Sequence, residues 1–295
     1  MHHILTLRTI TPLHSGTGQA VGTTDLPIAR ERVTNWPYVP GSSVKGVLRD
    51  AASVAWIAQQ EGARRTKNLG KQAGESLTFL FGSSERDNQR AGSLAVSDLR
   101  LLLFPVRSLV GSFAYATCQL ALGRANELLE VAGRPKLPEP VATGEHAVCA
   151  ADSKLVTDRQ VIFEDLVLAA ESGADSLVSP LANLTGIPAV SLQSRLAVVS
   201  DDLFTFLNET ATEVVTHVSL DFETRTAIPG HLRSEERVPA EAVFVGLARL
   251  DDLLGKPEDS DKSRSVLAQF NDQPYLQFGG KASVGNGLCK VGFTL

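Results

Sequence analysis

The order in which strand-like and helix-like segments follow one another constrains the fold of this chain more than any other feature. Residues 2–10 alternate apolar and polar side chains, which is typical of a half-buried strand. Residues 44–60 repeat apolar side chains at helical spacing. Further along, strand and helix patterns alternate without the regular rhythm of a doubly wound parallel sheet. The pattern predicts an α+β protein with a ferredoxin-like β-α-β-β-α-β core that carries insertions.

Three segments depart from this core pattern. Residues 134–195 have weak periodicity and several Pro and Gly, so we expect an insertion with its own short elements. Two strongly strand-like stretches, 213–228 and 236–250, predict a long β-hairpin over about 212–245. Residues 62–75 are polar, basic and glycine-containing, which predicts a loop.

Charge is distributed unevenly along the chain. The net charge is -5, yet residues 1–110 contain 13 Lys and Arg against 8 Asp and Glu, whereas residues 111–295 contain 15 against 25. A basic first part can attract phosphate groups while the acidic remainder keeps the molecule soluble. With 43% apolar residues, residues 1–295 are long enough to form one elaborated domain or two small ones, and we expect a single elaborated domain.

The sequence argues against a membrane protein, a secreted protein and a zinc protein. The apolar stretch LLLFPV at 101–106 is far shorter than the about 20 residues of a membrane span, and residues 1–14 lack the apolar stretch of a secretory signal. Cys118, Cys149 and Cys289 are too widely separated for a Cys-x-x-Cys zinc site. We expect a soluble, cytoplasmic protein with reduced thiols and no membrane partner.

The stretch PGSSVKGVLR has the features of a phosphate-binding helix start. Gly41, Ser42 and Ser43 open the predicted helix, where unpaired N–H groups and a partial positive charge favour an anion. Lys45 and Arg49 are four residues apart and therefore share one face. The spacing alone fits an ordinary capped helix with a solvated basic face equally well.

A second glycine-rich stretch, GGKASVGNG, lies between two predicted strands and contains Gly279, Gly280, Lys281, Gly285 and Gly287. It matches neither a Walker sequence nor a dinucleotide fingerprint. Successive N–H groups and the lysine of such a loop can nevertheless contact a phosphate. Taken by itself, the stretch is more typical of a tight hairpin.

Three carboxylates are candidates for chemistry. Asp25 stands in a Gly/Thr-rich loop, where an Asp usually forms a turn, but Arg30 and other basic residues follow it closely. An acid beside phosphate-binding cations can hold a divalent metal ion or accept a proton from a ribose hydroxyl. Glu235 and Glu236 are adjacent on a predicted strand, so their side chains point to opposite faces. For this pair a charged strand edge is the alternative.

These motifs give the chain a resemblance to a known family. The sequence resembles the RAMP superfamily and, within it, the backbone subunits of type III-B CRISPR (Cmr) effector complexes, in the segments 13–52, 80–83, 91–117, 201–204, 235–244 and 278–287. The resemblance runs from about residue 5 to the C-terminus. It implies an RRM-type, ferredoxin-like core with a protruding hairpin thumb. It also implies that copies stack head to tail along a CRISPR guide RNA.

The resemblance further implies a cleavage activity and its residues. Each such subunit holds a segment of guide and displaces one nucleotide of the guide–target duplex, so the target is cut at regular intervals. Asp25 matches the aspartate associated with cleavage, and Glu235 or Glu236 matches a functionally implicated glutamate. The residues expected to contact RNA are Lys45, Arg49, Ser42, Ser43, Gly41, Arg30, Gly279, Gly280, Lys281, Gly285 and Gly287.

The implied partners are the guide RNA, a single-stranded target RNA, further copies of the chain and other Cmr subunits. Weakly held Mg²⁺ or another divalent cation is expected at Asp25, which acts either as general base or as metal ligand. Arg233 and Ser234 stand where the family often has aromatic residues, and no aromatic RNP1 motif is present. RNA is therefore expected to be held through its backbone and shape. A non-catalytic RNA-binding scaffold and a stand-alone enzyme for a phosphorylated metabolite are the alternatives.

Overall fold

The structure is a computed structural model that describes residues 2–18, 24–60, 66–83, 90–251 and 257–294. Its strands are β1 (His2–Thr9), β2 (Tyr38–Val39), β3 (Leu94–Val96), β4 (Leu99–Arg107), β5 (Phe113–Cys118), β6 (His146–Cys149), β7 (Gln160–Phe163), β8 (Leu166–Ser172), β9 (Leu196–Val199), β10 (Glu213–His217), β11 (Arg233–Arg237), β12 (Val243–Leu250), β13 (Tyr275–Gln277) and β14 (Leu288–Thr294). Its helices are α1 (Gly41–Ala58), α2 (Lys67–Ser76), α3 (Thr78–Phe81), α4 (Gln119–Val131), α5 (Asp175–Thr185), α6 (Ala189–Arg195), α7 (Asp201–Thr210) and α8 (Pro257–Asp272), with a 3₁₀ turn at Ala282–Val284.

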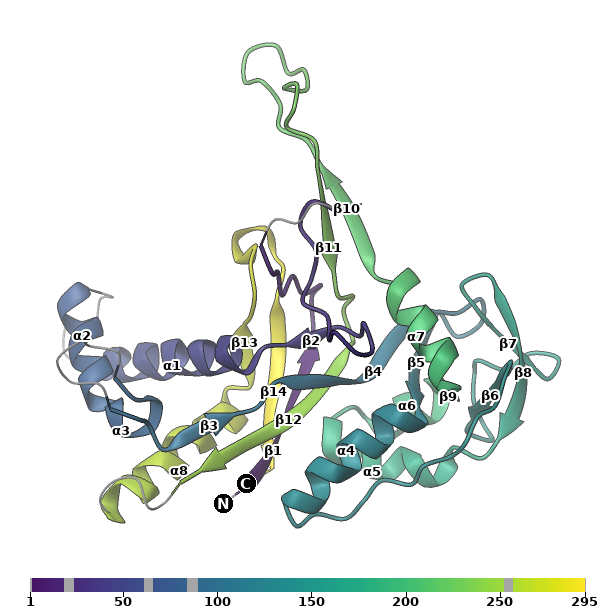
Figure 1. Cartoon of the computed structure of the whole chain (residues 1–295), viewed down its shortest axis with the longest axis horizontal. Coiled ribbons are helices and arrows are strands. Elements are labelled where there is room, and N and C mark those ends of the chain that lie inside the picture. The colour runs from purple at the N-terminus through teal and green to yellow at the C-terminus, as the bar shows by residue number, and fades with distance from the viewer. Residues whose placement is uncertain (1, 19–23, 61–65, 84–89, 252–256, 295) are drawn as a thin grey trace.

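A large mixed sheet runs through the molecule (Figure 1). Its strands follow the order β13-β14-β1-β12-β4-β5-β9-β6-β8-β7, with β2 paired to β4 and β3 paired to β12. The neighbours β14, β1, β12 and β3 or β4 are antiparallel to one another. Along the chain, α1 follows β1 and α8 follows β12. The mixture of helices and strands expected from the sequence is confirmed.

Strand β1 is buried on both faces. Leu5 and Leu7 belong to the core that also contains residues of α1 and α8, whereas Ile4 belongs to the core that contains residues of α4 and α5. The polar residue Thr6 is also buried, and its hydroxyl donates to the carbonyl oxygen of Gly292 on β14. The expectation of a half-buried strand over residues 2–10 is therefore wrong, because helices cover both sides of the sheet here.

The segment 134–195 contains the short elements β6, β7, β8, α5 and α6. These strands extend the main sheet, since β6 pairs antiparallel with β9 and parallel with β8. In Figure 1 they lie at the end of the sheet that is opposite to α2 and α3.

Strands β10 and β11 form a separate antiparallel pair, with Thr216 opposite Ser234. The segment between them projects away from the main sheet (Figure 1). The strand-like stretch 236–250 is not one continuous strand of the hairpin. Its first residues belong to β11, whereas β12 pairs with β1 in the main sheet rather than with β10. Pro239 lacks an N–H donor and Glu241 has a φ of 76°, so strand pairing is interrupted between β11 and β12.

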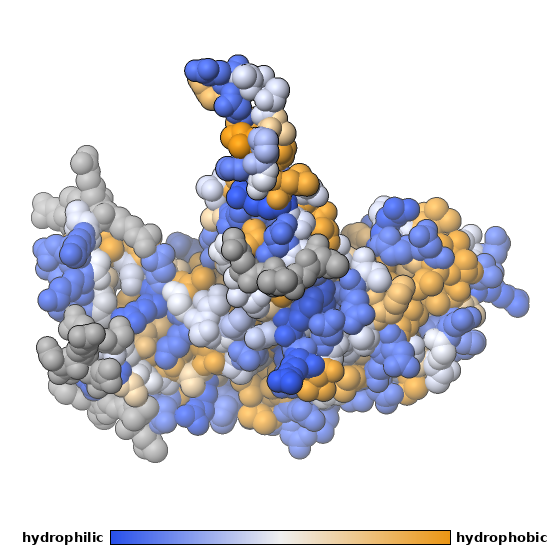
Figure 2. Space-filling view, turned by 45° about the horizontal axis from the view of Figure 1, so that its top comes forward, coloured by the Kyte–Doolittle hydropathy of each residue, from blue (hydrophilic) through white to orange (hydrophobic). Residues whose placement is uncertain are grey.

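The projecting segment carries an exposed apolar surface. Figure 2 shows apolar residues along it, and its exposed large apolar side chains are Val218, Leu220, Phe222 and Leu232, to which β10 adds Val214. Phe222 is 86% exposed and lies beside the guanidinium of Arg225, which is 5.8 Å from the ring centre. This surface has no counterpart within the described part of the chain that would cover it.

The prediction of a loop over residues 62–75 is wrong for residues 67–75, which lie in α2. The hydroxyl of Thr66 accepts a hydrogen bond from the N–H of Leu69 and so caps the helix. Ala73 is completely buried and anchors the helix to the rest of the chain. Residues 62–65 lie outside the described residues.

We predict that Gly287→Ala destabilises the protein more than Gly285→Ala. Both glycines have positive φ, 81° and 86°, so either substitution costs about 1 kcal/mol of backbone strain. A Cβ at 287 would also collide with the carbonyl oxygen of Phe278, whereas a Cβ at 285 meets nothing within 4 Å. We expect an additional loss of about 1 to 3 kcal/mol for Gly287→Ala in equilibrium urea unfolding. Equal losses from the two variants would contradict this account of the loop.

Candidate functional site

The strands β10 and β11 and the segment between them form a projecting hairpin, and the paired strands are its root. The residues around Asp25 pair with β11 at this root. The N–H of Leu26 donates to the carbonyl oxygen of Ser234 at 3.1 Å, and the N–H of Glu236 donates to the carbonyl oxygen of Leu26 at 3.0 Å. Leu26 and Glu235 form a parallel bridge. The N-terminal loop thus lies beside β11 and is joined to it by one isolated parallel bridge.

This pairing brings Asp25 against Ser234. The N–H of Ser234 donates to Oδ2 of Asp25 at 2.7 Å, and the hydroxyl of Ser234 donates to the same oxygen at 3.0 Å. These two bonds, the backbone bond first, hold the pKa of Asp25 below its ordinary value. Asp25 is exposed, so an ionised carboxylate faces solvent at the root of the hairpin.

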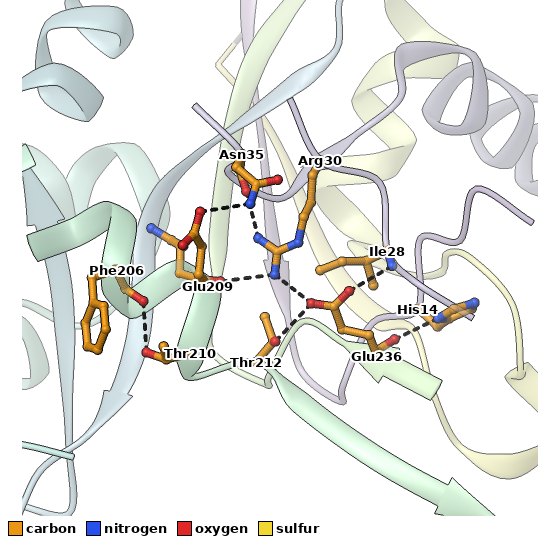
Figure 3. Close-up of polar contacts among 10 residues, drawn as sticks. His14, Ile28, Arg30, Asn35, Phe206, Glu209, Thr210, Thr212 and Glu236 are labelled. Atoms are coloured by element: carbon orange, nitrogen blue, oxygen red, sulfur yellow. Dashed lines mark hydrogen bonds and ion pairs between the residues drawn. The ribbon is translucent and has the colours of Figure 1, made fainter. Parts of the chain in front are cut away.

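Glu236 lies in a closed network with Arg30 (Figure 3). Nη2 of Arg30 lies 2.6 Å from Oε1 of Glu236, and the N–H of Ile28 donates to Oε2 at 3.2 Å. Arg30 also donates to the carbonyl oxygens of Asn35 and Asn208, at 2.7 and 3.1 Å. Both terminal nitrogens of Arg30 therefore bond groups of the chain itself.

Glu235 points away from this network and is completely buried. Nε of Arg237 donates to Oε1 at 3.0 Å, and Nζ of Lys281 lies 3.3 Å from Oε2. Burial alone would raise the pKa of Glu235, but the bonds from Arg237 and Lys281 outweigh burial and lower it. Of the three candidate carboxylates, Asp25 is the exposed one, whereas Glu235 and Glu236 are buried in ion pairs.

The glycine-rich loop packs against residues 12–14. The N–H of Gly280 donates to the carbonyl oxygen of His14 at 3.0 Å, and the N–H of Gly287 donates to that of Pro12 at 2.8 Å. The N–H of Gly285 donates within the loop, and Gly279 has a φ of 65° that suits glycine. The loop uses these N–H groups to close on the N-terminal segment and places Lys281 beside Glu235.

A basic groove of about 510 Å³ lies at the start of α1. Gly41, Ser42, Lys45 and Arg49 line it together with Arg90, which the sequence did not single out. Local sequence indicates this role of Arg90 only weakly. Arg90 lies beside the groove because Gly82 and Gly92 approach closely, and a Cβ on Gly92 would collide with the backbone of Gly82.

The helix begins at Gly41 after Pro40, which provides no side-chain cap. No side-chain cap is formed by Ser42 or Ser43, and the N–H of Gly41 donates to Oδ1 of Asp98 at 2.8 Å. Nζ of Lys45 donates to the carbonyl oxygen of Leu94 at 2.7 Å. Burial, reinforced by the charge of Arg49, lowers the pKa of Lys45. Within the described residues, no hydrogen bond or ion pair joins this groove to Asp25.

The described part of the chain contains no group of three or more His, Cys, Asp or Glu side chains that could hold a metal ion by itself. It also contains no helix that is long and apolar enough to cross a membrane.

The chain is similar to proteins of one family, which confirms the resemblance noted in its sequence. The model of the RAMP superfamily matches residues 6–290. The CRISPR system Cmr endoribonuclease Cmr4 of Pyrococcus furiosus is 33% identical over 299 residues, which cover 98% of this chain and 94% of the relative.

Solved structures show the same relationship. The crystal structure of oligomeric Cmr4 from Pyrococcus furiosus is similar with a TM-score of 0.74 and 29% identity, covering 99% of this chain and 98% of the other. A chain in the cryo-EM structure of a type III-B Cmr-beta complex bound to cognate target RNA has a TM-score of 0.73 but 16% identity, covering 99% and 97%. The second similarity shows a shared fold.

We predict that Glu235→Gln lowers the free energy of unfolding by about 3 kcal/mol at neutral pH, because it breaks a buried ion pair. The folded pKa of Glu235 lies below the ordinary value of 4.5. Its charge therefore adds stability that is fully present above pH 4.5 and is lost as the pH falls through the folded value. The difference between wild type and variant in urea unfolding should shrink below pH 4.5.

The exposed Glu223 provides a control for this experiment. Glu223→Gln should change the unfolding free energy by less than about 0.5 kcal/mol. A Glu235→Gln variant that is as stable as wild type at neutral pH would show that the buried ion pair contributes nothing.

Proposed function

The chain belongs to the RAMP superfamily, and from that premise we propose that it is the guide-RNA-binding backbone subunit of a type III-B (Cmr) CRISPR effector complex. In that complex it forms a head-to-tail filament along the guide, contacts other Cmr subunits and cuts complementary target RNA at regular intervals. It acts in the cytoplasm, where its RNA ligands lie. The observation that carries the cleavage role is the exposed, ionised carboxylate of Asp25 at the root of the projecting hairpin.

We further propose that residues 1–295 form a single domain with a ferredoxin-like, RRM-type core. The support is the antiparallel order β14-β1-β12-β3/β4 with α1 after β1 and α8 after β12. In this proposal residues 134–195 are an insertion, and residues of about 212–245 form a thumb. The exposed apolar side chains of the projecting segment suit a thumb that separates one nucleotide from a duplex.

The basic groove at the start of α1 is proposed to bind the guide backbone. Lys45, Arg49 and Arg90 supply positive charge to the groove, which Gly41 and Ser42 also line. Ser43, the next residue of α1, is proposed to add a hydroxyl group beside them. Such contacts recognise phosphate and accept any guide sequence. The glycine-rich loop, Gly279, Gly280, Lys281, Gly285 and Gly287, is proposed to support RNA from the hairpin side. Arg30, with its guanidinium bound inside the chain, contributes by holding the hairpin root.

Cleavage is proposed to follow from the geometry of a displaced target nucleotide. Its 2′-oxygen attacks the adjacent phosphorus in line, the bond to the 5′-oxygen breaks, and the products end in a cyclic phosphate and a 5′-hydroxyl. The carboxylate of Asp25 orients the 2′-hydroxyl and accepts its proton as general base, and the leaving 5′-oxygen takes up a proton from water. Glu235 and Glu236 hold the surrounding segments in place, since their own oxygens are bound to cationic side chains.

A weakly held divalent cation such as Mg²⁺ fits this site as a partner of Asp25. Mg²⁺ commonly binds one or two carboxylates and completes its shell with phosphate oxygens and water. Asp25 offers one such exposed carboxylate, and the described residues bring no cluster of further acidic ligands to it. When bound, the cation would supply positive charge to the phosphate oxygens.

A non-catalytic scaffold subunit is the second candidate function. It is favoured by the burial of Glu235 and Glu236, which leaves a single exposed carboxylate at the hairpin root. The two functions share the guide-binding groove and differ in the role of Asp25.

We predict that Asp25→Asn lowers target cleavage by the assembled complex at least about 100-fold, while guide binding and assembly are unchanged. Cleavage of labelled complementary RNA, with and without EDTA, measures the effect and its dependence on a cation. The matched control is Asp175→Asn, since Asp175 is likewise exposed and accepts hydrogen bonds, from the N–H of Ala151 and the side chain of Gln193, outside the thumb. Cleavage by Asp25→Asn at the wild-type rate would favour the scaffold function.

We predict that Lys45→Ala combined with Arg49→Ala weakens guide binding and lowers the slope of log affinity against log salt by about 1 to 2. The reason is that two phosphate contacts and their released counterions are lost. Lys71→Ala is the control, because Lys71 is exposed on α2 and paired with Glu75 outside the groove. An unchanged salt slope in filter-binding titrations would contradict the proposed role of the groove.

A further inference from the structure

We propose that Ser234 is a positioning residue for Asp25. It fixes one carboxylate oxygen, Oδ2, against the hairpin root and leaves the other, Oδ1, for the target RNA. This inference rests on the proposed cleavage function and assigns a role to a residue that the sequence does not indicate as functional.

The contacts of Ser234 are reciprocal. Its N–H and its hydroxyl both donate to Oδ2 of Asp25, at 2.7 and 3.0 Å. Its hydroxyl oxygen also accepts a hydrogen bond from the N–H of Asp25 at 3.0 Å. A hydroxyl can donate and accept at once, so this side chain satisfies the backbone and the carboxylate of Asp25 together.

The backbone pairing beside these contacts does not depend on the hydroxyl. The bonds from Leu26 N–H to the carbonyl oxygen of Ser234 and from Glu236 N–H to the carbonyl oxygen of Leu26 join main-chain atoms. Glu236 also holds Ile28 and Arg30 with its side chain. Removal of the Ser234 hydroxyl therefore leaves Oδ2 of Asp25 with the backbone N–H of Ser234 as its remaining bond from that residue. The carboxylate can then turn about this single bond while the loop remains attached to β11.

The two carboxylate oxygens of Asp25 have different surroundings. Oδ2 carries both bonds from Ser234, whereas Oδ1 accepts no side-chain hydrogen bond from the residues that the structure describes. An exposed aspartate without such bonds samples several rotamers. The Ser234 contacts remove that freedom before RNA binds, so the benefit appears in the cleavage step rather than in target binding.

The experiment is single-turnover cleavage of labelled target RNA by complexes assembled with wild type, Ser234→Ala and Ser234→Thr. We expect Ser234→Ala to lower the cleavage rate constant about 10- to 100-fold, as small misplacements of a reacting group do. The target concentration for half-saturation should change by less than about 2-fold. Ser234→Thr should restore the rate, because it keeps the hydroxyl and suits a strand.

Two further variants test the hydroxyl itself. Thr210 is an exposed residue at the end of α7 whose hydroxyl donates to the carbonyl oxygen of Phe206 at 2.8 Å, so Thr210→Ala removes a hydroxyl outside the thumb and should cleave like wild type. Ser234→Cys keeps the shape of the side chain but has a weak donor. It should cleave slowly, and it serves as the test should Ser234→Ala fail to assemble.

The outcomes separate this inference from the proposed function. An inactive Asp25→Asn together with wild-type rates for Ser234→Ala and Ser234→Cys would overturn the role of Ser234 alone. Normal cleavage by Asp25→Asn would overturn the cleavage role of Asp25 itself. In the double variant, Ser234→Ala should add no further loss to Asp25→Asn. A raised half-saturation with an unchanged rate constant would mean that Ser234 contributes to binding instead.

Discussion

The root of the projecting hairpin depends on how two adjacent carboxylates are neutralised from opposite faces of β11. Glu236 is bound by Arg30, which comes from the N-terminal part of the chain. Glu235 is bound by Arg237 and by Lys281, which comes from the C-terminal glycine-rich loop. Leaving one such carboxylate unpaired would cost several kcal/mol. β11 is therefore stable only when both distant segments lie against it, and this requirement places Asp25 at their junction.

The same arrangement separates charged residues that look alike in the sequence. Asp25 keeps an exposed carboxylate, whereas the two buried glutamates balance half-buried cations and cannot move without breaking the hairpin root. Arg30 is likewise occupied inside the chain, while Lys45 and Arg49 line a groove in which Lys45 also donates to the carbonyl oxygen of Leu94. Burial and pairing, rather than charge alone, distinguish the side chains that hold the fold from those that line the groove.

Much of this could be predicted from local patterns. The helix predicted over residues 44–60 corresponds to α1. The prediction succeeds because the apolar side chains recur at helical spacing and form the face of α1 that is buried. The opposite directions of Glu235 and Glu236 follow from strand geometry. The pairing of Lys281 with Glu235 and the parallel alignment of Leu26 with β11 could not be predicted, because nothing local encodes contacts between distant segments. The helix α2 was missed for a similar reason, since the burial of Ala73 stabilises it more than its polar sequence indicates.

The most direct test of the account is a structure of the assembled complex with guide RNA and a target whose 2′-hydroxyl is replaced by hydrogen at the cleavage position. The account predicts that this 2′ position and its phosphate lie beside Oδ1 of Asp25, with Oδ2 still bound to Ser234. Glu235 and Glu236 should remain paired with Lys281 and Arg30. A cleavage-site phosphate that lies beside a released Glu235 or Glu236, with Asp25 turned away from the RNA, would contradict it.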